Sequence, residues 1–349
     1  MPAREEYPLE ATAALPGLAF GPMRSIMLRA ANQLSLPVIE DEEERILIST
    51  AHGLVGLRQG EGPSALVTVA AVDARWLFVM KGGVVDQLSH MFPDVAKGLR
   101  WSDAALSNGL PPNFQFAKVK GVEAVGTAFL RVRIGADDFS RYGTDAIHFR
   151  LVLPPPGAAK VEWPTVGENG ATVWPSGGNA LHRPVYTTRF VDAGTGTMDF
   201  DVFIHEGGRV TKWAREHRPN AVVGIVGPGG GGIPRTSHII MHSDETGFPA
   251  VARILDALPE DATGLVTLLS NDGEGCAYPF TAPSGVGLTW LKRGPDTSFA
   301  ADAIAAQEAH PEHFAWFAGR KADAQKVRAA YKARGADAER AYIAGYWSG

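Results

Sequence analysis

The segment DVFIHEGGRVTKWARE, residues 201–216, has the residue types that bind a phosphate group. An apolar run leads into two glycines, and the spacing after them predicts a helix. Gly207 and Gly208 would let a ligand approach the backbone, and Val210 and Thr211 would present amide groups at the positive end of that helix. The Thr211 hydroxyl can add a hydrogen bond. The sequence therefore predicts a pyrophosphate site in this segment.

A second glycine-rich segment, GPGGGGIPR at residues 227–235, contains the Gly-x-Gly-x-x-Gly spacing of dinucleotide-binding loops at Gly227, Gly229 and Gly232. That motif requires a strand before the glycines and a helix that begins on them. Here an Ile-Pro pair follows, and then a short apolar run that predicts another strand. We therefore interpret these glycines as a flexible connection between two domains.

The segment HRPVYTTR, residues 182–189, resembles the Arg-x-Tyr-Thr strand of the siderophore-interacting flavoprotein family. The resemblance implies that Tyr186 stacks on the flavin and that Thr187 reaches its reactive edge. The family's arginine stands two places before the tyrosine, where this chain has proline, so Arg183 and Arg189 are the candidates for the cofactor phosphates. Read alone, a Tyr-Thr pair on a strand reflects ordinary β-propensity.

The phosphate-binding segment described first also resembles this family, in which a strand ends in His, passes through glycines and opens a helix bearing a small hydroxyl residue and a Trp. The resemblance implies that Gly208, Val210, Thr211 and Trp213 bind the cofactor. His205 either contacts the flavin or is a structural histidine.

Two further segments match the family in the same order. SDETGFPAVARILDALP resembles its Asp-Glu-Thr-x-x-Pro-Ala stretch. This segment is either a cap over the cofactor or an ordinary helix capped by Ser243 or Asp244. The final AYIAGYWSG resembles its Tyr-Trp-x-x-Gly ending, where Trp347 covers a flavin face or is simply packed. The cofactor-binding residues that the resemblance implies are Arg183, Tyr186, Thr187, Thr188, Arg189, His205, Gly208, Val210, Thr211, Trp213, Asp244, Glu245, Thr246 and Trp347.

The strand and helix patterns around these residues predict a multidomain chain. Strand and helix patterns over residues 24–104 indicate a small α/β domain, which resembles a domain of unknown function fused to this family, after a frayed N-terminus. Six strand-like runs over 114–233 predict an antiparallel β-barrel that binds FAD, interrupted by a Gly/Pro-rich lid or surface loop at 154–183. Alternating strands and helices over 236–349 predict a parallel-sheet α/β domain that binds NAD(P)H, as in ferredoxin reductases.

Composition narrows the function classes for this chain of 349 residues. A net charge of -5 without a basic cluster argues against a nucleic-acid or membrane-surface binder. The single cysteine, Cys276, excludes an internal disulfide and a four-cysteine zinc site and favours a cytoplasmic location, as does the absence of a secretory signal. His238 and His242 are spaced to share one face of a helix but fall on a predicted strand, and the loop pair His310/His313 lacks further ligands, so we expect no metal site.

The resemblance implies an NAD(P)H-dependent, FAD-containing reductase of ferric siderophores or similar iron chelates, in which the flavin carries the chemistry and no side-chain acid or base is required. Alternatives are a non-catalytic siderophore- or flavin-binding protein, and an NAD(P)H:flavin reductase with a non-iron acceptor. Asp272 and Glu274 favour NADH over NADPH by charge. The candidate basic contacts for an anionic chelate are Lys212, Arg215, Lys292 and Arg293.

Overall fold

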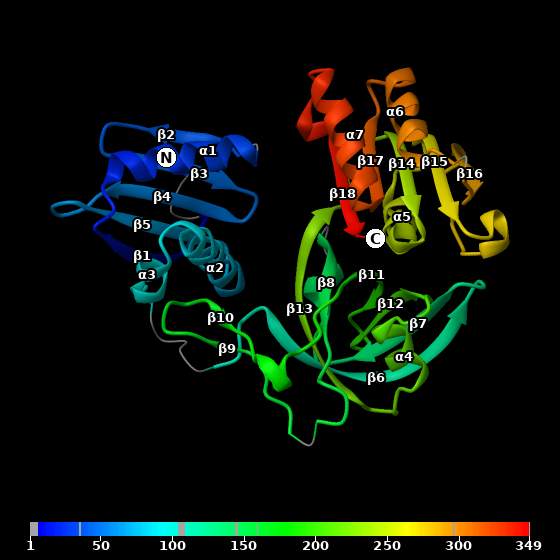
Figure 1. The fold of residues 1–349 in the computed structure, drawn as a ribbon, viewed down its shortest axis with the longest axis horizontal. Helices are drawn as coiled ribbons and strands as arrows, with labels where there is room; N and C mark the ends of the chain where they lie inside the picture. Colours follow the sequence, from blue (N-terminus) through cyan, green and yellow to red (C-terminus); the bar gives the residue numbers. More distant parts are fainter. Residues whose placement is uncertain are drawn as a thin grey trace. The chain divides into compact units, whose positions relative to one another are not determined.

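The computed structural model forms two compact units (Figure 1). The first unit runs to Gln115 and includes Pro154–His182, and the second comprises Phe116–Leu153 and the chain from Arg183 onward. The Gly/Pro-rich segment in the middle of the chain therefore belongs with the N-terminal unit. The structure describes residues 6–34, 36–103, 109–143, 146–158, 160–295 and 297–348.

The N-terminal unit is a five-stranded antiparallel sheet of order β1-β5-β4-β3-β2 with helices packed on it. The prediction of a frayed N-terminus was wrong for Leu9–Pro16, because β1 pairs with β5 along its whole length and buries Ala11, Ala13 and Leu15. The elements are β1 (Leu9–Pro16), α1 (Phe20–Gln33), β2 (Val38–Asp41), β3 (Arg45–Thr50), β4 (Gly53–Gln59), β5 (Ser64–Ala71), α2 (Ala74–Met91) and α3 (Pro93–Gly98).

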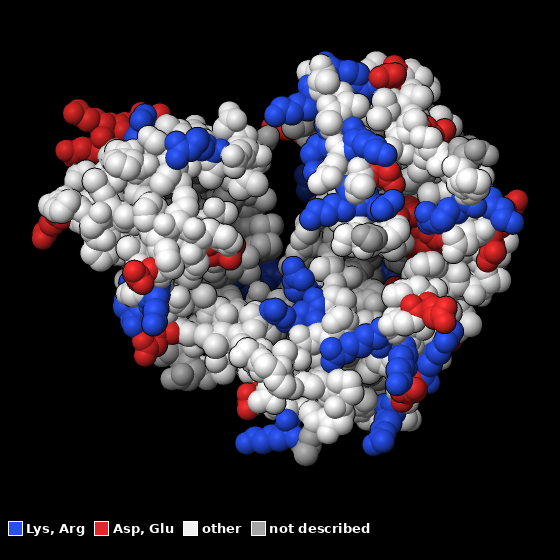
Figure 2. Space-filling model, viewed as in Figure 1, with Lys and Arg blue, Asp and Glu red and all other residues white. Residues whose placement is uncertain are grey.

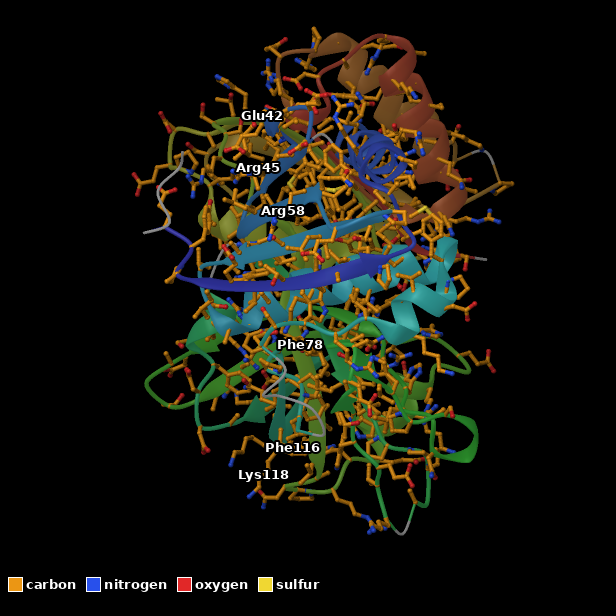
Figure 3. The ribbon with its side chains drawn as sticks, turned by 90° about the vertical axis from the view of Figure 1, so that its left-hand side faces the viewer. Glu42, Arg45, Arg58, Phe78, Phe116 and Lys118 are labelled. Carbon is orange, nitrogen blue, oxygen red and sulfur yellow. The ribbon has the colours of Figure 1, made fainter. Side chains whose placement is uncertain are left out.

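Helix α2 shows why this unit has its own core. Asp73 caps the helix by accepting a 2.7 Å hydrogen bond from the Trp76 amide. Its buried residues Leu77, Val85 and Leu88 join those of the sheet in one cluster, and Phe78 is buried as well. In Figure 3 the side chains of Arg45 and Arg58 lie on paired strands of this sheet.

The segment Pro154–His182 packs on the same unit. It contains a small hairpin of β9 (Thr165–Val166) and β10 (Thr172–Val173). The Trp101 indole donates a 3.0 Å hydrogen bond to the Asn169 carbonyl, and the Asn169 amide group donates to the Ala96 carbonyl at 3.1 Å. These bonds hold the segment in place as an ordered extension of the N-terminal unit.

The second unit begins with the predicted antiparallel barrel, which is closed in the order β11-β12-β7-β6-β13-β8. Strand β13 runs through Gly227–Gly232 and pairs with β8 through two register shifts. The interpretation of these glycines as a flexible connection was therefore wrong. The elements are β6 (Phe114–Val125), β7 (Phe129–Gly135), β8 (Ala146–Val152), β11 (Val185–Asp192), β12 (Thr197–Phe203), α4 (Arg209–Arg215) and β13 (Val222–Gly232).

The chain from His238 forms the predicted parallel sheet, of order β16-β15-β14-β17-β18. A 3-10 turn at Glu245–Gly247 precedes the amphipathic helix α5, so the helix begins a few residues later than its cap. The elements are β14 (His238–Asp244), α5 (Phe248–Ala257), β15 (Thr263–Ser270), β16 (Gly285–Lys292), α6 (Phe299–Ala309), β17 (Phe314–Arg320), α7 (Lys321–Ala333) and β18 (Ala341–Trp347).

Charge is unevenly distributed over each unit (Figure 2). Acidic side chains of the N-terminal unit gather at the β2–β3 end, where residues 40–44 are all Asp or Glu. Lys and Arg side chains lie over the C-terminal helices and the barrel on the face shown. Among the helices that the structure describes, none is long and apolar enough to cross a membrane.

Candidate functional site

The predicted phosphate-binding segment opens helix α4. Gly207 has φ +74°, a left-handed conformation that favours glycine, and no described atom lies within 4 Å of the position that a Cβ on it would take. The first bond of the helix joins the Lys212 amide to the Gly208 carbonyl at 3.0 Å. The amides of Val210 and Thr211 precede that bond, in the turn where helix N–H groups have no carbonyl partner within the helix. Amide groups without a partner at the start of a helix are the kind of backbone donor that can bind an anion.

The buried face of α4 is fixed by the barrel. Val210 is buried in the barrel core and Trp213 packs against it. The buried Thr211 hydroxyl donates to the Phe203 carbonyl at 3.4 Å. Val210 can therefore serve a ligand only through its backbone. His205 is exposed, and its ring lies 2.8 Å from where a Cβ on Gly208 would stand, so a larger residue there would require the ring to move.

Strand β11 carries the Tyr-Thr pair. The Tyr186 ring is half-buried, with its centroid 5.2 Å from that of Phe200 and 6.5 Å from that of Phe149. Burial raises the pKa of the Tyr186 hydroxyl, so the ring stays neutral through the physiological range. Two barrel phenylalanines thus hold a rigid aromatic ring at the edge of the core, as a stacking surface requires.

Thr187 points to a buried histidine that the sequence analysis did not identify. The Thr187 hydroxyl lies 3.2 Å from His148 Nδ1, and the Tyr346 hydroxyl lies 3.0 Å from His148 Nε2. Burial, and then the nearby Arg253, lower the pKa of His148 to about 4. His148 therefore joins β8, β11 and β18 as a neutral imidazole. A lone His in a strand pattern gives no signal of this role, because its partners lie 39 and 198 residues away.

The family-like segment at Asp244 and the chain's final aromatic residues meet. The Trp347 indole donates a 2.6 Å hydrogen bond to Asp244 Oδ2, while Asp244 Oδ1 accepts from the Thr246 amide at 3.0 Å and from its hydroxyl at 2.5 Å. Burial raises the pKa of Asp244, and these donors partly offset that effect. The structure thus brings together Asp244, Thr246 and Trp347, at the carboxyl ends of the parallel strands, where such sheets bind ligands.

Glu245 and Arg293 form an ion pair at the same edge. The buried Glu245 carboxylate accepts from the Asn271 amide at 2.9 Å and from the Arg293 guanidinium at 2.5 Å. Burial raises its pKa. Arg293 also donates to the Asn271 side chain at 3.0 Å. The Arg293 guanidinium thus neutralises a buried carboxylate, and its assignment as a substrate contact stays a prediction.

Other predicted site residues have structural partners. Thr188 is 0% exposed and its hydroxyl faces the Met198 sulfur at 3.6 Å, so the assignment of Thr188 as a cofactor-binding residue stays a prediction that its side chain does not support. Arg189 is buried and pairs with Asp256 of α5 at 2.5 Å. This pair links the barrel to the sheet domain, so Arg189 is not a freely available phosphate ligand.

The remaining basic candidates are exposed. Arg183 precedes β11, where burial of part of its side chain and the nearby Arg150 lower its pKa. Lys212 and Arg215 lie in the last turn of α4, and Lys292 ends β16. These four cations come from three separate elements of the second unit.

Two family models match this chain over the regions just described. The siderophore-interacting FAD-binding domain matches residues 118–232, and the siderophore-interacting protein model matches residues 236–349. A relative from Escherichia coli strain K12, an NADPH-dependent ferric-chelate reductase, is 30% identical over 243 residues, which cover 67% of this chain and 92% of the relative. This chain belongs to the siderophore-interacting protein family.

Other relatives in the family agree. Ferric vibriobactin reductase of Vibrio cholerae is 28% identical over 53% of this chain and 68% of its own. A siderophore utilization protein from T. fusca has a similar solved structure, with a TM-score of 0.57 and 25% identity over 67% of this chain and 92% of its own. A siderophore-interacting protein from Aeromonas hydrophila shares the fold, with a TM-score of 0.56, 23% identity and coverage of 68% and 92%. The family models do not extend into the first 117 residues.

The residues present fit an FAD. The open space beside Gly207 and the amide groups that begin α4 suit a pyrophosphate, and the half-buried Tyr186 ring on the same barrel suits a flavin ring.

Proposed function

We propose that this protein is an FAD-dependent reductase that transfers electrons from NAD(P)H to a ferric siderophore and so releases iron as Fe(II). The observation that carries the proposal is that the open amide end of α4 and the Tyr186 ring lie on one barrel, joined to a parallel sheet whose carboxyl edge carries Asp244 and Trp347. We propose residues 114–233, apart from Pro154–His182, as the FAD-binding domain and 236–349 as the NAD(P)H-binding domain. The N-terminal unit, which contains the predicted domain at 24–104 together with β1, is proposed as a small separate domain.

In this proposal the protein's residues bind and orient, and FAD supplies hydride acceptance and single-electron transfer. The amides of Val210 and Thr211, with the open backbone at Gly207, hold the pyrophosphate. Tyr186 stacks on the ring system, and the Thr187 hydroxyl, oriented by His148, lies beside it. Trp347, held by Asp244, covers the edge of the sheet that a nicotinamide nucleotide would approach.

The proposed iron substrate is an anionic chelate. Siderophore oxygens are hard ligands that hold Fe(III) better than Fe(II), so reduction loosens the complex. Exposed cations of the second unit, Lys212, Arg215 and Lys292, supply positive charge for such a substrate. We place the reaction in the cytoplasm, where reduced nicotinamide nucleotides are regenerated.

The charges at the end of β15 favour NADH as the electron donor. Asp272 and Glu274 are exposed there, and a carboxylate at that position accepts a ribose hydroxyl but repels a 2′-phosphate. The Escherichia coli relative is by its name NADPH-dependent. Steady-state kinetics of this protein with both donors at one ionic strength distinguishes the two, and a higher kcat/KM for NADPH would overturn the charge argument.

One experiment tests the proposed function. Purified protein should be yellow with bound FAD, should bleach when reduced nicotinamide nucleotide is added without air, and should recover its colour when a ferric siderophore is then added. Fe(II) formation is followed with a ferrous-specific chelator. Bleaching without reoxidation by any ferric chelate would leave a flavin reductase with another acceptor, and a protein that binds FAD without bleaching would be a binding protein.

A further inference from the structure

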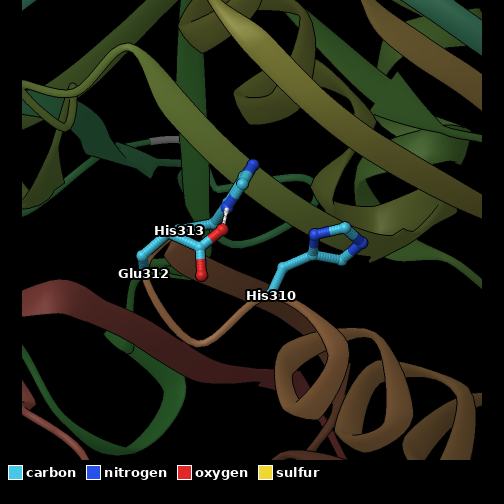
Figure 4. A group of neighbouring side chains, drawn as sticks. All are labelled: His310, Glu312 and His313. Atoms are coloured by element: carbon cyan, nitrogen blue, oxygen red, sulfur yellow. Dashed lines mark ion pairs between the residues drawn. The ribbon is translucent and has the colours of Figure 1, made fainter.

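A tight turn between α6 and β17 brings three metal-ligand side chains together, far from the residues proposed to bind FAD. His310 is the residue that ends α6, and the His313 amide donates a 3.1 Å hydrogen bond back to the His310 carbonyl. Pro311 lies inside the turn and limits its conformations. His310, Glu312 and His313 therefore come from one short, closed stretch of backbone (Figure 4).

The donor atoms of these side chains are close. One ligand atom from each of His310, Glu312 and His313 lies within 4.8 Å of the others. The two imidazole rings have centroids 5.1 Å apart at an angle of 63°, so they do not stack. The His313 Nδ1 atom lies 2.8 Å from Glu312 Oε1. Such a group can converge on one ion with small side-chain rotations, and Glu312, with 59% of its side chain exposed, is free to make them.

His313 provides a separate reason to expect a ligand. Its Nδ1 atom is buried and, among the described residues, makes no hydrogen bond that meets the geometric criteria; its near neighbour is the Glu312 carboxylate at 2.8 Å. A buried polar atom without a partner costs free energy. A metal ion between the two groups would satisfy this nitrogen and the carboxylate at once.

We propose that His310, Glu312 and His313 bind one divalent first-row transition-metal ion. Imidazole nitrogen with one carboxylate is a ligand set for Zn²⁺, Fe²⁺, Ni²⁺ or Cu²⁺, whereas Mg²⁺ and Ca²⁺ prefer oxygen ligands alone. Three protein ligands leave a coordination position for water or an exchangeable group. The sequence analysis expected no metal site because it counted the two histidines and missed Glu312.

Other side chains contact the turn. The Glu312 backbone carbonyl accepts a hydrogen bond from the Arg340 guanidinium, so its side-chain carboxylate is left to the two histidines. His238, which begins β14, has its ring centroid 5.4 Å from that of His313 and uses Nδ1 for a 2.8 Å contact with the Thr263 hydroxyl. Because β14 and β17 both begin here, the site lies at the amino edge of the parallel sheet, opposite the edge carrying Asp244 and Trp347.

Titration calorimetry with Zn²⁺ on the tag-free, FAD-loaded full chain tests the proposal. We expect one ion per chain, and weaker binding at acid pH because only neutral imidazole is a ligand. His310→Ala and His313→Ala should each weaken binding at least about tenfold, and Glu312→Gln about tenfold, by analogy with losses seen on altering metal sites. His90→Ala, which removes an exposed histidine of α2, should leave binding unchanged. Mg²⁺ in place of Zn²⁺ should give no binding.

X-ray absorption of the Zn²⁺-loaded protein gives a second readout that needs no variant. Two imidazole ligands in the coordination shell support the site. Binding that is equally tight in the His310→Ala/His313→Ala double variant, or no stoichiometric binding by the wild-type protein, would overturn the proposal. Neither result depends on reductase activity, so failure here leaves the proposed function standing.

Discussion

The second unit contains two glycine-rich segments, Gly207–Gly208 and Gly229–Gly232, whose glycines meet different needs. The first precedes helix α4 and leaves open space beside Gly207. The second has the Gly-x-Gly-x-x-Gly spacing of a dinucleotide-binding loop, but it continues strand β13 and no helix begins on it. There a Cβ on Gly230 would lie 2.8 Å from the His148 ring, and a Cβ on Gly231 would lie 2.3 Å from the Tyr342 ring.

This comparison indicates that a glycine-rich segment can form a phosphate-binding site where a helix begins directly after it. In α4 the missing side chain exposes amides to a ligand. In β13 it lets the aromatic rings of β8 and β18 pack against the backbone. We therefore expect substitutions in the first segment to change ligand binding and substitutions in the second to change stability.

The largest effect is expected for Thr211→Asp, which places a carboxylate in the first turn of α4. Like charges brought together cost several kcal/mol, so FAD affinity should fall by about 4 kcal/mol, roughly a thousandfold. Thr211→Val, which keeps the shape without the charge, is the matched control and should retain most of the flavin. Flavin content after dialysis and the melting temperature are measured together, and a folded Thr211→Asp protein with a full complement of FAD would refute the role of α4.

His148, packed under the second segment, should make stability depend on pH. Its folded pKa of about 4 lies below the ordinary 6.5, so the unfolded chain takes up a proton that the folded chain does not. The contribution of His148 to the free energy of unfolding is complete above about pH 6.5. It declines by about 3 kcal/mol as the pH falls toward 4. Urea unfolding of wild type and His148→Gln across this range should show a smaller slope in the variant. Parallel pH profiles would contradict the buried neutral imidazole.

Gly231→Ala should lower the free energy of unfolding by about 2 kcal/mol, because the new Cβ must displace the Tyr342 ring. Gly229→Ala is its control, since no described atom lies within 4 Å of that Cβ position. FAD affinity should change little in either. If Gly231→Ala instead removed the flavin without loss of stability, the second segment would be a binding loop after all.

The smallest effect is expected for Tyr186→Ala, which removes the stacking ring. The loss in FAD affinity should be about 1.5 kcal/mol, as for other contacts between an aromatic side chain and a base. Tyr186→Phe keeps the ring and should bind FAD as the wild type does. The measurement is a fluorescence titration of the apoprotein with FAD, and equal affinities for the three proteins would move the flavin away from β11.

Much of the fold could be predicted from local sequence. Six strand-like runs became the six barrel strands, and alternating strands and helices after residue 236 became the parallel sheet, because periodicity reports which face of an element is buried. The Asp73 cap and the turn at Asp244 were also predictable, since their hydrogen bonds span two or three residues. Strand β1 was missed because its sequence, LEATAALP, consists mostly of small residues and gives little apolar alternation.

The features that could not be predicted from the sequence depend on contacts between segments that are distant along the chain. Sequence by itself determined which residues resemble a flavin site, and the helix start at Gly208 carries its own signal. It did not determine that Thr188 and Arg189 are buried, that Arg293 neutralises Glu245, or that His148 joins Thr187 to Tyr346. These outcomes depend on which surfaces the closed barrel and the sheet bring together, and burial, which sets the pKa of His148, exists only once they have packed.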